Sequence, residues 1–372
     1  MPMLQVDNQT PFAAALSVFP DAQGIETAYA VVKATFSLGA GEPVLAETQL
    51  PLLAADVYWG DPQRSSLRAA GEFALLKPAT DVLLTGRAVA QAPGTRVADV
   101  SLRIGPLHKA VRVFGERHWE GSGPTMKPSA PQPFERIPLV WELAFGGLAP
   151  EVSGQDPAQR EHEPRNPVGR GMAGGHWAWL KEQPVPNLED PAAPIQTATD
   201  RPPPACFAPV APTWLPRRLF AGTYDAAWQQ QRAPYLPLDF DARYFQLAPA
   251  GLVAPGLLQG GEPVELIGFT LGGPLRFTLP ALHLQLDFRF DGRPMPQPAR
   301  LETVLFEPDH GRLQMLWRAA QPVDKKLLKL SALSVRCAEH GQDGRPPPPL
   351  ARLQGLPRSY ADDEDATLAV PP

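Results

Sequence analysis

The run Leu284-Gln285-Leu286-Asp287-Phe288-Arg289-Phe290 has an apolar residue at every second position and a polar residue between each pair. Successive side chains of a β-strand point to opposite faces of the sheet, so this alternation predicts a strand with one apolar face. The same reasoning predicts five further strands between residues 264 and 335. Because the connections are short, we expect neighbouring strands to pair antiparallel in a meander. The five further strands are expected at residues 264–269, 275–279, 301–306, 313–317 and 327–335.

Turns rich in glycine separate these strands. Residues 271–274 and 309–312 have the composition of hairpin turns, whereas Asp291-Gly292 is expected to start a longer connection. Alternation at 30–38 and 98–104 predicts further strands, with one set of side chains in the core and the other facing solvent or a second layer. We therefore expect a mainly β fold: antiparallel β-sandwich or open-barrel sheets in two halves, with long Pro-rich loops and few short helices.

Composition divides the chain into segments. The 372 residues include 47 prolines and 31 glycines, well above the usual share for a globular protein. The long Pro/Gly-rich stretch is expected to be ordered, because residues 176–180 supply bulky anchors; disorder is the alternative. The expected segments are an N-terminal β domain at 1–150, a Pro/Gly-rich excursion packed on the scaffold at 151–222, a short helix and an aromatic-acidic segment at 223–261, a C-terminal antiparallel β meander at 262–338, and a mobile Pro-rich acidic tail at 339–372.

Charge and targeting signals narrow the partner classes. The net charge of −5 argues against nucleic acid or an anionic membrane as the main partner. No apolar run approaches 18 residues, and the first residues lack the basic and apolar regions of a signal peptide, so we expect a cytoplasmic protein. The two cysteines, Cys206 and Cys337, are expected to be reduced thiols. The sequence leaves the oligomeric state open.

Aromatic residues and prolines are concentrated between Trp214 and Asp241. Within this block, Thr223 is a plausible N-cap for a helix that Pro234 would end. Rigid aromatic and arginine side chains often dominate protein recognition. The alternative for each of these residues is packing in the core, which we expect for Trp228 on the inner face of the helix. The candidate partner-binding residues are Trp177, Trp179, Trp214, Arg217, Arg218, Tyr224, Trp228 and Tyr235.

Sequence motifs for catalysis are missing. The chain contains no H-x-x-x-H pair, no C-x-x-C motif and no G-x-S-x-G elbow, and its glycine-rich runs do not join a strand to a helix as a phosphate loop does. We therefore assign no catalytic residue, metal site or cofactor. A hydrolase acting on carbohydrate remains an alternative, because two carboxylates could act on a sugar among these aromatics. Its candidate acids are Asp56, Asp61, Asp239 and Asp241, although Asp239 and Asp241 more simply cap a turn. A third alternative is a structural β module that pairs through exposed strand edges.

A series of ordered motifs resembles the bacterial family labelled domain of unknown function 2169. The resemblance covers most of residues 6–330 and excludes the acidic tail. The motifs are Thr10–Phe12, Val32–Phe36, Asp56–Pro62, Ser65–Arg68, Lys77–Val82, Val113–Trp119, Ala144–Gly147, Asn166–Gly169, Pro186–Pro191, Trp214–Asp241 and Gly260–Glu262.

This resemblance implies a role in protein handling. Members of the family occur beside genes for type VI secretion spikes, PAAR-repeat proteins and toxic effectors, and they are regarded as adaptors or chaperones that load an effector onto the spike. It implies no catalytic residues. We therefore expect a non-enzymatic adaptor or chaperone that binds a type VI effector, or its PAAR or spike carrier, before secretion.

Overall fold

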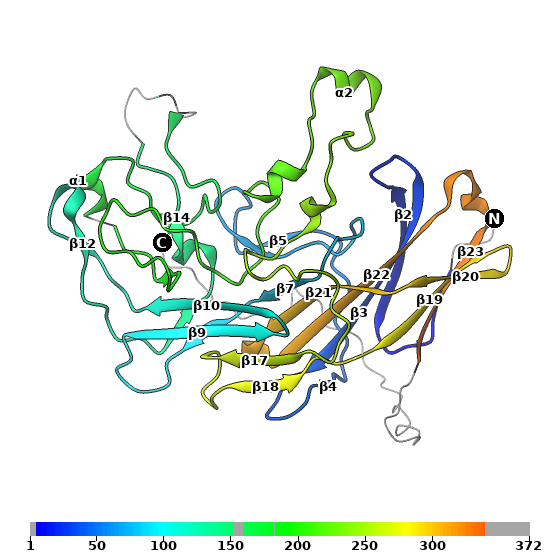
Figure 1. Ribbon diagram of the computed structural model, residues 1–372, viewed down its shortest axis with the longest axis horizontal. Coiled ribbons are helices and arrows are strands. Elements are labelled where there is room, and N and C mark those ends of the chain that lie inside the picture. Colours follow the sequence, from blue (N-terminus) through cyan, green and yellow to red (C-terminus); the bar gives the residue numbers. More distant parts are fainter. Residues whose placement is uncertain (1–4, 152–155, 157–158, 182, 339–372) are drawn as a thin grey trace.

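The computed structural model describes residues 5–151, 156, 159–181 and 183–338. The fold is mainly β, as the sequence predicts, and the described residues form two short α-helices, α1 (Trp177–Leu180) and α2 (Ala226–Gln231). The predicted tail at 339–372 lies outside the described residues. Three larger sheets form an elongated body, from which the segment that carries α2 projects (Figure 1).

A six-stranded sheet forms the centre of this body. Its strands run in the order β2, β3, β22, β21 and β7, with β4 paired to the end of β3. Only the pairing of β7 with β21 is parallel; the other pairs are antiparallel. The strands are β2 (Ala13–Pro20), β3 (Glu26–Ser37), β4 (Val44–Leu45), β7 (Asp81–Leu84), β21 (Arg300–Glu307) and β22 (Arg312–Pro322).

Both faces of this sheet are covered, so β3 is buried over all but its two end residues. Val32 and Trp317 lie in the main hydrophobic core on one face. On the other face, residues 46–74 form a strap, in which Glu72 bonds the side chain of Lys33, while Gln49 bonds both backbone groups of Thr35 at the edge of the sheet. The predicted core face is thus confirmed, and of the two alternatives for the other face, solvent or a second layer, the strap forms a second layer.

A four-stranded sheet extends the core at one end. Its order is β1, β23, β19, β20, and β1 pairs parallel with β23 while the other pairs are antiparallel. The quoted alternating run is strand β19, as predicted. Asp291-Gly292 does not start a longer connection, because both residues have positive φ and turn the chain directly into β20. The strands are β1 (Gln5–Asn8), β19 (His283–Phe290), β20 (Arg293–Pro298) and β23 (Leu330–Ala338).

A five-stranded sheet lies at the other end. Its order is β16, β10, β9, β17, β18, and β9 and β17, which are far apart in sequence, pair antiparallel. The strands predicted between 262 and 338 are therefore distributed over all three sheets and do not form one meander. Each larger sheet joins strands from the first and the second half of the chain. The strands are β9 (Val97–Ile104), β10 (Leu107–Phe114), β16 (Leu188–Glu189), β17 (Pro263–Ile267) and β18 (Leu275–Thr278).

Small two-stranded pairs and 3-10 helices complete the described fold. The pairs are β5 (Val57–Tyr58) with β6 (Leu67–Ala69), β8 (Arg87–Val89) with β13 (Arg136–Pro138), β11 (Trp119–Glu120) with β12 (Lys127–Pro128), and β14 (Phe145–Gly146) with β15 (Arg170–Gly171). The 3-10 helices are η1 (Gly123–Thr125), η2 (Trp141–Leu143), η4 (Arg217–Phe220), η5 (Ala242–Phe245), η6 (Pro308–His310) and η7 (Asp324–Lys329).

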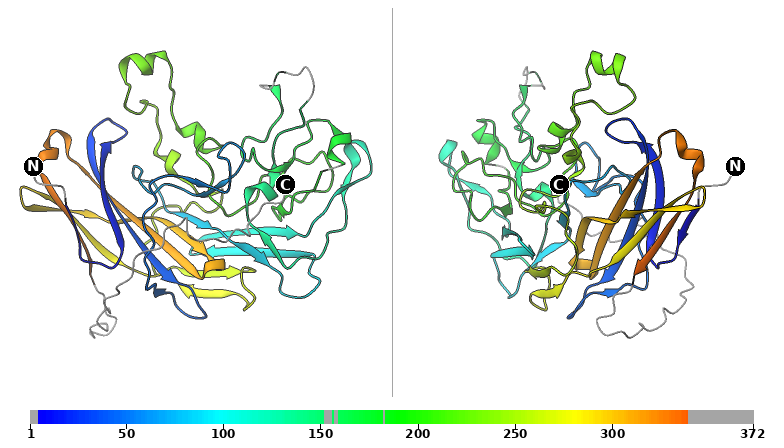
Figure 2. Two further views of the ribbon diagram at one scale, coloured as in Figure 1. Left: turned by 180° about the vertical axis from the view of Figure 1, so that it is seen from behind. Right: turned by 45° about the vertical axis from the view of Figure 1, so that its right-hand side comes forward.

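A second, smaller core lies in the lobe that contains α1. Leu180 of α1 is fully buried there with Trp119 and Phe145, and Trp177 and Trp179 pack against this cluster. The described part of the 151–222 excursion thus has bulky anchors at the positions that the sequence indicates. The lobe lies at the opposite end of the body from the four-stranded sheet in both views of Figure 2.

Candidate functional site

Gly222–Asp241 forms an arm that projects from the body in every view (Figures 1 and 2). Its two ends are joined at a narrow neck. The backbone N–H and the hydroxyl of Thr223 donate to the two carboxylate oxygens of Asp239, at 3.0 and 2.7 Å. The N–H of Asp241 donates to the carbonyl of Phe220. These bonds hold the arm closed where it leaves the body.

The neck requires glycine at position 222. Gly222 has φ +81°, a conformation that L side chains rarely adopt. A Cβ at this position would lie 2.9 Å from an oxygen of Asp239 and 2.9 Å from Cβ of Pro237. The two chain segments therefore approach too closely for any larger residue.

Helix α2 forms the tip of the arm and begins two residues later than expected. The predicted N-cap, Thr223, is engaged at the neck, and Asp225 caps the helix through a 2.8 Å bond from the N–H of Trp228 to its side chain. Asp225 satisfies a backbone donor that a helix start leaves unpaired. The existence of the helix is thus confirmed, and its predicted cap is wrong.

Aromatic side chains contact one another within the arm. The rings of Tyr224 and Trp228 meet edge to face with centroids 4.7 Å apart. The indole Nε1 of Trp228 donates to the carbonyl of Tyr235 at 2.8 Å. Trp228 is half-buried within the arm and belongs to neither hydrophobic core. The expectation that it packs in the core is wrong, because the helix lies away from the body.

The arm rests against the turn between β2 and β3. Arg232 donates from Nη2 to the carbonyl of Ala22 at 3.0 Å and from Nε to the carbonyl of Leu236 at 2.9 Å. A Cβ added at Gly24 would lie 3.3 Å from the ring of Tyr235, so the turn and the ring approach closely. These contacts support one side of the arm and fix its direction.

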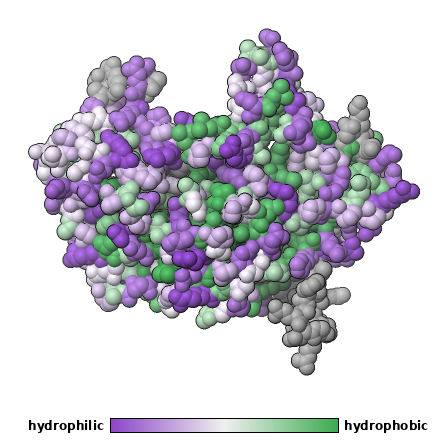
Figure 3. Space-filling view, viewed as in Figure 1, coloured by the Kyte–Doolittle hydropathy of each residue, from purple (hydrophilic) through white to green (hydrophobic). Residues whose placement is uncertain are grey.

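The arm also presents apolar surface to solvent. Leu238 is 86% exposed, Tyr224 53% and Tyr235 40%. Figure 3 shows apolar residues on the projecting arm among polar ones. Side chains of this kind, held on a supported element, can bury area against a partner with a small loss of conformational entropy.

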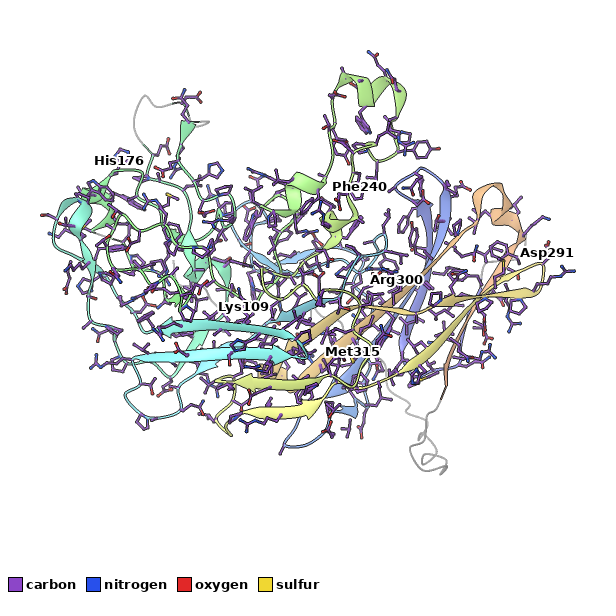
Figure 4. All side chains as sticks on the ribbon, viewed as in Figure 1. Lys109, His176, Phe240, Asp291, Arg300 and Met315 are labelled. Atoms are coloured by element: carbon purple, nitrogen blue, oxygen red, sulfur yellow. The ribbon has the colours of Figure 1, made fainter. Side chains whose placement is uncertain are left out.

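The base of the arm is a packed aromatic group. Phe240, Tyr244 and Phe245 contact one another with ring centroids 5.5–5.8 Å apart. Phe240 lies where the arm meets the body (Figure 4). Asp241 caps η5 by accepting from the N–H of Arg243, and the Arg243 side chain lowers the pKa of this carboxyl.

A cavity of about 290 Å³ lies beneath this base. Its floor is the strap-covered face of the six-stranded sheet, where Lys33, Leu316 and Thr303 stand opposite one another on β3, β22 and β21. Residues 53–56 and 68–74 of the strap and η4 and η5 of the arm base enclose it. Asp56 and Phe73 of its lining are exposed, so the cavity reaches the surface beside the strap.

Cationic groups of the cavity lining form three ion pairs. Lys33 pairs with Glu72 at 2.8 Å, Lys77 with Asp81 at 2.6 Å, and Arg318 with Glu302. Burial lowers the pKa of Lys77, against the opposing effect of Asp81. Asp81 also accepts bonds from the amide nitrogens of Gln246, Leu247 and Ala248, which ties the segment after η5 to β7.

Two further arginines line the cavity, and no described carboxylate lies within ion-pair distance of either. Arg217 of η4 is 7% exposed and donates to the carbonyls of Val210 and Tyr244 at 2.6 and 2.9 Å. Burial lowers its pKa. The guanidinium of Arg68 lies 5.0 Å from the ring centroid of Trp59. The cavity thus combines apolar walls with an excess of positive charge.

The sequence-predicted anchors fall into separate places. Tyr224, Trp228 and Tyr235 come together in the arm, and Arg218 is exposed at its base. Trp177 and Trp179 lie in the lobe with α1, away from the arm (Figure 1). The remaining two are buried: Trp214 is 5% exposed and meets Trp141 edge to face, and Arg217 lines the cavity.

The candidate acids of the hydrolase alternative all accept hydrogen bonds: Asp56 between two segments of the strap, Asp61 in a turn, Asp239 at the neck and Asp241 at the start of η5. Asp56 accepts from the N–H of Gly71, Asp61 from that of Gln63, Asp239 from Thr223 and Asp241 from Arg243. Among the described residues, no group of three or more His, Cys, Asp or Glu side chains is placed to hold a metal ion. Burial raises the pKa of the Cys206 thiol to about 12, and Cys206 and Cys337 are not joined in a disulfide.

Sequence reasoning missed Arg68, Lys33, Leu238 and Tyr244. Leu238 lies inside the aromatic block and could have been found by its apolar character. The cavity residues are spread from position 33 to position 318, so only the pairing of the sheets brings them together.

A family model described as "Uncharacterized protein conserved in bacteria (DUF2169)" matches residues 23–318. The chain belongs to this family. The DUF2169 match contains the arm, the strap and every residue that lines the cavity. Searches of curated proteins and of solved structures returned no match. In the described part of this DUF2169 chain, no helix has the length and apolar character needed to span a bilayer.

Proposed function

We propose that this DUF2169 protein is a non-enzymatic adaptor that holds another protein through its projecting arm. The observation that carries the proposal is the supported arm with the exposed side chains of Tyr224, Tyr235 and Leu238. An exposed apolar group on a projecting, hydrogen-bonded element favours a binding role over a role in the core.

The internal bonding of the arm supports this role physically. The Thr223–Asp239 bonds at the neck and the Trp228–Tyr235 bond at the tip fix the arm before any partner arrives. A preformed element loses less conformational entropy on docking, so more of the contact energy contributes to affinity.

The partner class follows from the family resemblance of the sequence motifs. In this proposal the partner is a type VI secretion effector, or its PAAR or spike carrier, which the adaptor holds before secretion. The adaptor acts in the cytoplasm, where the cargo is made. The hydrolase alternative has no specific observation in its favour, because its candidate acids accept hydrogen bonds in the strap, a turn, the neck and η5.

Co-purification with a matched pair of variants tests the proposal. The tagged chain is expressed with its native neighbouring genes, and the proteins that follow it are identified by mass spectrometry. Leu238→Asp places a charge on the arm, and Leu271→Asp does the same at an exposed leucine of the β17–β18 turn. We expect an effector, PAAR or spike protein with the wild type and with Leu271→Asp, and its loss with Leu238→Asp.

Three results would contradict all or part of the proposal. If no protein co-purifies with the wild-type chain, the adaptor proposal fails. If Leu238→Asp keeps its partner, the arm is not the holding element. If a partner depends on Leu238 but has no relation to secretion, the adaptor role stands and the link to type VI secretion fails.

A further inference from the structure

The cavity at the base of the arm has an unbalanced electrostatic make-up. Lys33, Lys77 and Arg318 each have a carboxylate partner, whereas Arg68 and Arg217 have none among the described residues. Arg217 bonds only to neutral carbonyl groups. Such bonds satisfy N–H donors but are not ion pairs, and the carboxylates of Asp56 and Asp81 act on the Arg217 charge only from beyond ion-pair distance.

A buried guanidinium without a paired carboxylate is costly in an isolated protein. A carboxylate bound beside it would offset that cost, because guanidinium and carboxylate form paired, charge-assisted hydrogen bonds. Arg318 also retains a buried Nε–H without a hydrogen-bond partner, although its two terminal nitrogens bond to Glu302 and Glu72. The polar part of the lining is therefore suited to an anion.

The rest of the lining is apolar. Leu83, Leu305 and Leu316 form the floor, and Pro209, Pro212, Phe245 and Leu247 form part of the wall. At about 290 Å³ the cavity is at the small end of ligand pockets, so it suits a group the size of one or two residues. A ligand that fits both parts carries a carboxylate next to an apolar side chain.

We infer that the cavity binds the C-terminal carboxylate of a polypeptide that ends in an apolar residue. Arg217 and Arg68 hold the carboxylate, and the leucines of the sheet floor receive the last side chain. The chain end enters beside the strap, where Asp56 and Phe73 are exposed. Capture of a terminal carboxylate is a recurring mode of peptide recognition.

The inference deepens the proposed function and rests on it. Arg217 lies in η4, immediately before the arm, and Tyr244 and Phe245 lie in η5, immediately after it. A partner held by the arm is thus beside an opening that can take its chain end. Two contacts on one partner raise the overall affinity beyond either contact alone.

Short synthetic peptides test the inference directly on the full chain. The probes are acetyl-Gly-Gly-Leu with a free carboxylate and the same peptide with a C-terminal amide, measured by calorimetry. Each charge-assisted hydrogen bond contributes about 1.5–3 kcal/mol, so the acid should bind roughly tenfold tighter or more. Equal binding of acid and amide, or no binding of either, would overturn the inference.

Charge-removing variants locate the carboxylate. Arg68→Gln should reduce the preference for the acid about tenfold, whereas Arg103→Gln, at an exposed β9 residue outside the cavity, should leave it unchanged. Arg217→Lys keeps a charge but loses the paired geometry, and should weaken acid binding. Thermal unfolding of each variant checks its fold, and Arg68→Gln alone decides the outcome if Arg217→Lys does not fold.

Competition with free anions completes the experiment. Inorganic phosphate and acetate should compete only at concentrations far above that of the peptide acid, because they lack the apolar side chain. Tighter binding of phosphate than of the peptide would overturn the inference in favour of a small anion. If the peptides fail while Leu238→Asp still loses its protein partner, the inference fails and the proposed adaptor function stands.

Discussion

At the scale of single residues, the neck of the arm depends on Gly222 and Asp239. Gly222 supplies a positive φ and the space for the opposite chain segment, and Asp239 ties that segment to Thr223. Neither role is visible in sequence, where Gly222 is one of 31 glycines and Asp239 was a candidate acid. The reason is that both roles arise from a contact between chain segments that the helix separates.

Replacing Gly222 with alanine should open the neck. The left-handed conformation alone costs about 1 kcal/mol, and the two contacts at 2.9 Å add to that cost. Gly251→Ala is the matched control, because Gly251 has φ +86° but nothing within 4 Å of a Cβ. We expect faster tryptic cleavage after Arg232 in the Gly222 variant only. Equal cleavage in both variants would show that the close approach does not hold the arm.

Acid should loosen the same neck. Bonds from the backbone and side chain of Thr223 lower the pKa of the exposed Asp239 carboxyl from its ordinary value of 3.8. The charged form therefore stabilises the closed neck above pH 3.8, and this stabilisation is lost as the pH falls through the lowered pKa. The Thr223 amide resonance should report a midpoint below 3.8, and Asp239→Asn should remove that transition. A midpoint above 3.8 would contradict the assignment.

At the scale of elements, the strap is fixed to the six-stranded sheet by a buried charge. Lys33 of β3 is 1% exposed and bonds both oxygens of Glu72, which also accepts from the N–H of Leu53. The alternation at 30–38 predicted the strand but could not show that its second face is covered. In the sequence alone, Lys33 could equally face solvent, because the pattern does not identify its partner Glu72, which lies 39 residues later.

Breaking this pair should destabilise the protein strongly. Glu72→Gln leaves a buried cation without a partner, which costs about 3–5 kcal/mol of unfolding free energy. Adding Lys33→Met should restore most of that loss, because the unpaired charge is removed. Asp99→Asn breaks the exposed Arg112–Asp99 pair and should cost about 1 kcal/mol or less. Denaturant unfolding measures the free energy of unfolding of each variant. Similar losses of this free energy in Glu72→Gln and Asp99→Asn would contradict the role of burial.

Local sequence rules were most reliable where an element depends on its own residues. The alternating run at 284–290 matches β19 within one residue, and the helix around residue 228 exists. Strand β20 was missed because Pro294, Pro296 and Pro298 normally argue against a strand. It is an edge strand, where a residue without a backbone N–H is tolerated. Whether prolines are tolerated in a strand thus depends on its position in the sheet, which local sequence rules do not predict.

At the scale of the whole molecule, strands from both halves of the chain share each larger sheet. Strand β3 pairs with β22, β9 with β17, and β1 with β23. The alternation predicted most of these strands, and the mainly β class with them. The alternation could not show which strands pair, because every amphipathic strand has the same pattern. The cavity between the sheet, the strap and the arm depends on that pairing and so could not be predicted either.

Separate halves of the chain should therefore not fold. A fragment of residues 1–261 lacks β17, β21 and β22, which leaves β3, β7 and β9 without major partners. We expect it to show no cooperative unfolding and poor dispersion of amide resonances. Mixing it during refolding with residues 262–372 should restore both properties. A fragment 1–261 that unfolds cooperatively alone would show that the N-terminal β segment is an independent domain.

The pairing of β3 with β22 has a consequence during synthesis. About 275 residues separate the end of one strand from the start of the other, so a ribosome needs roughly 14–55 s to supply the partner. Throughout that interval the apolar hairpin of β2 and β3 is outside the exit tunnel with one long edge unpaired. Newly made chains therefore depend on holding factors in the cell, and the yield of folded protein should fall when such factors are scarce.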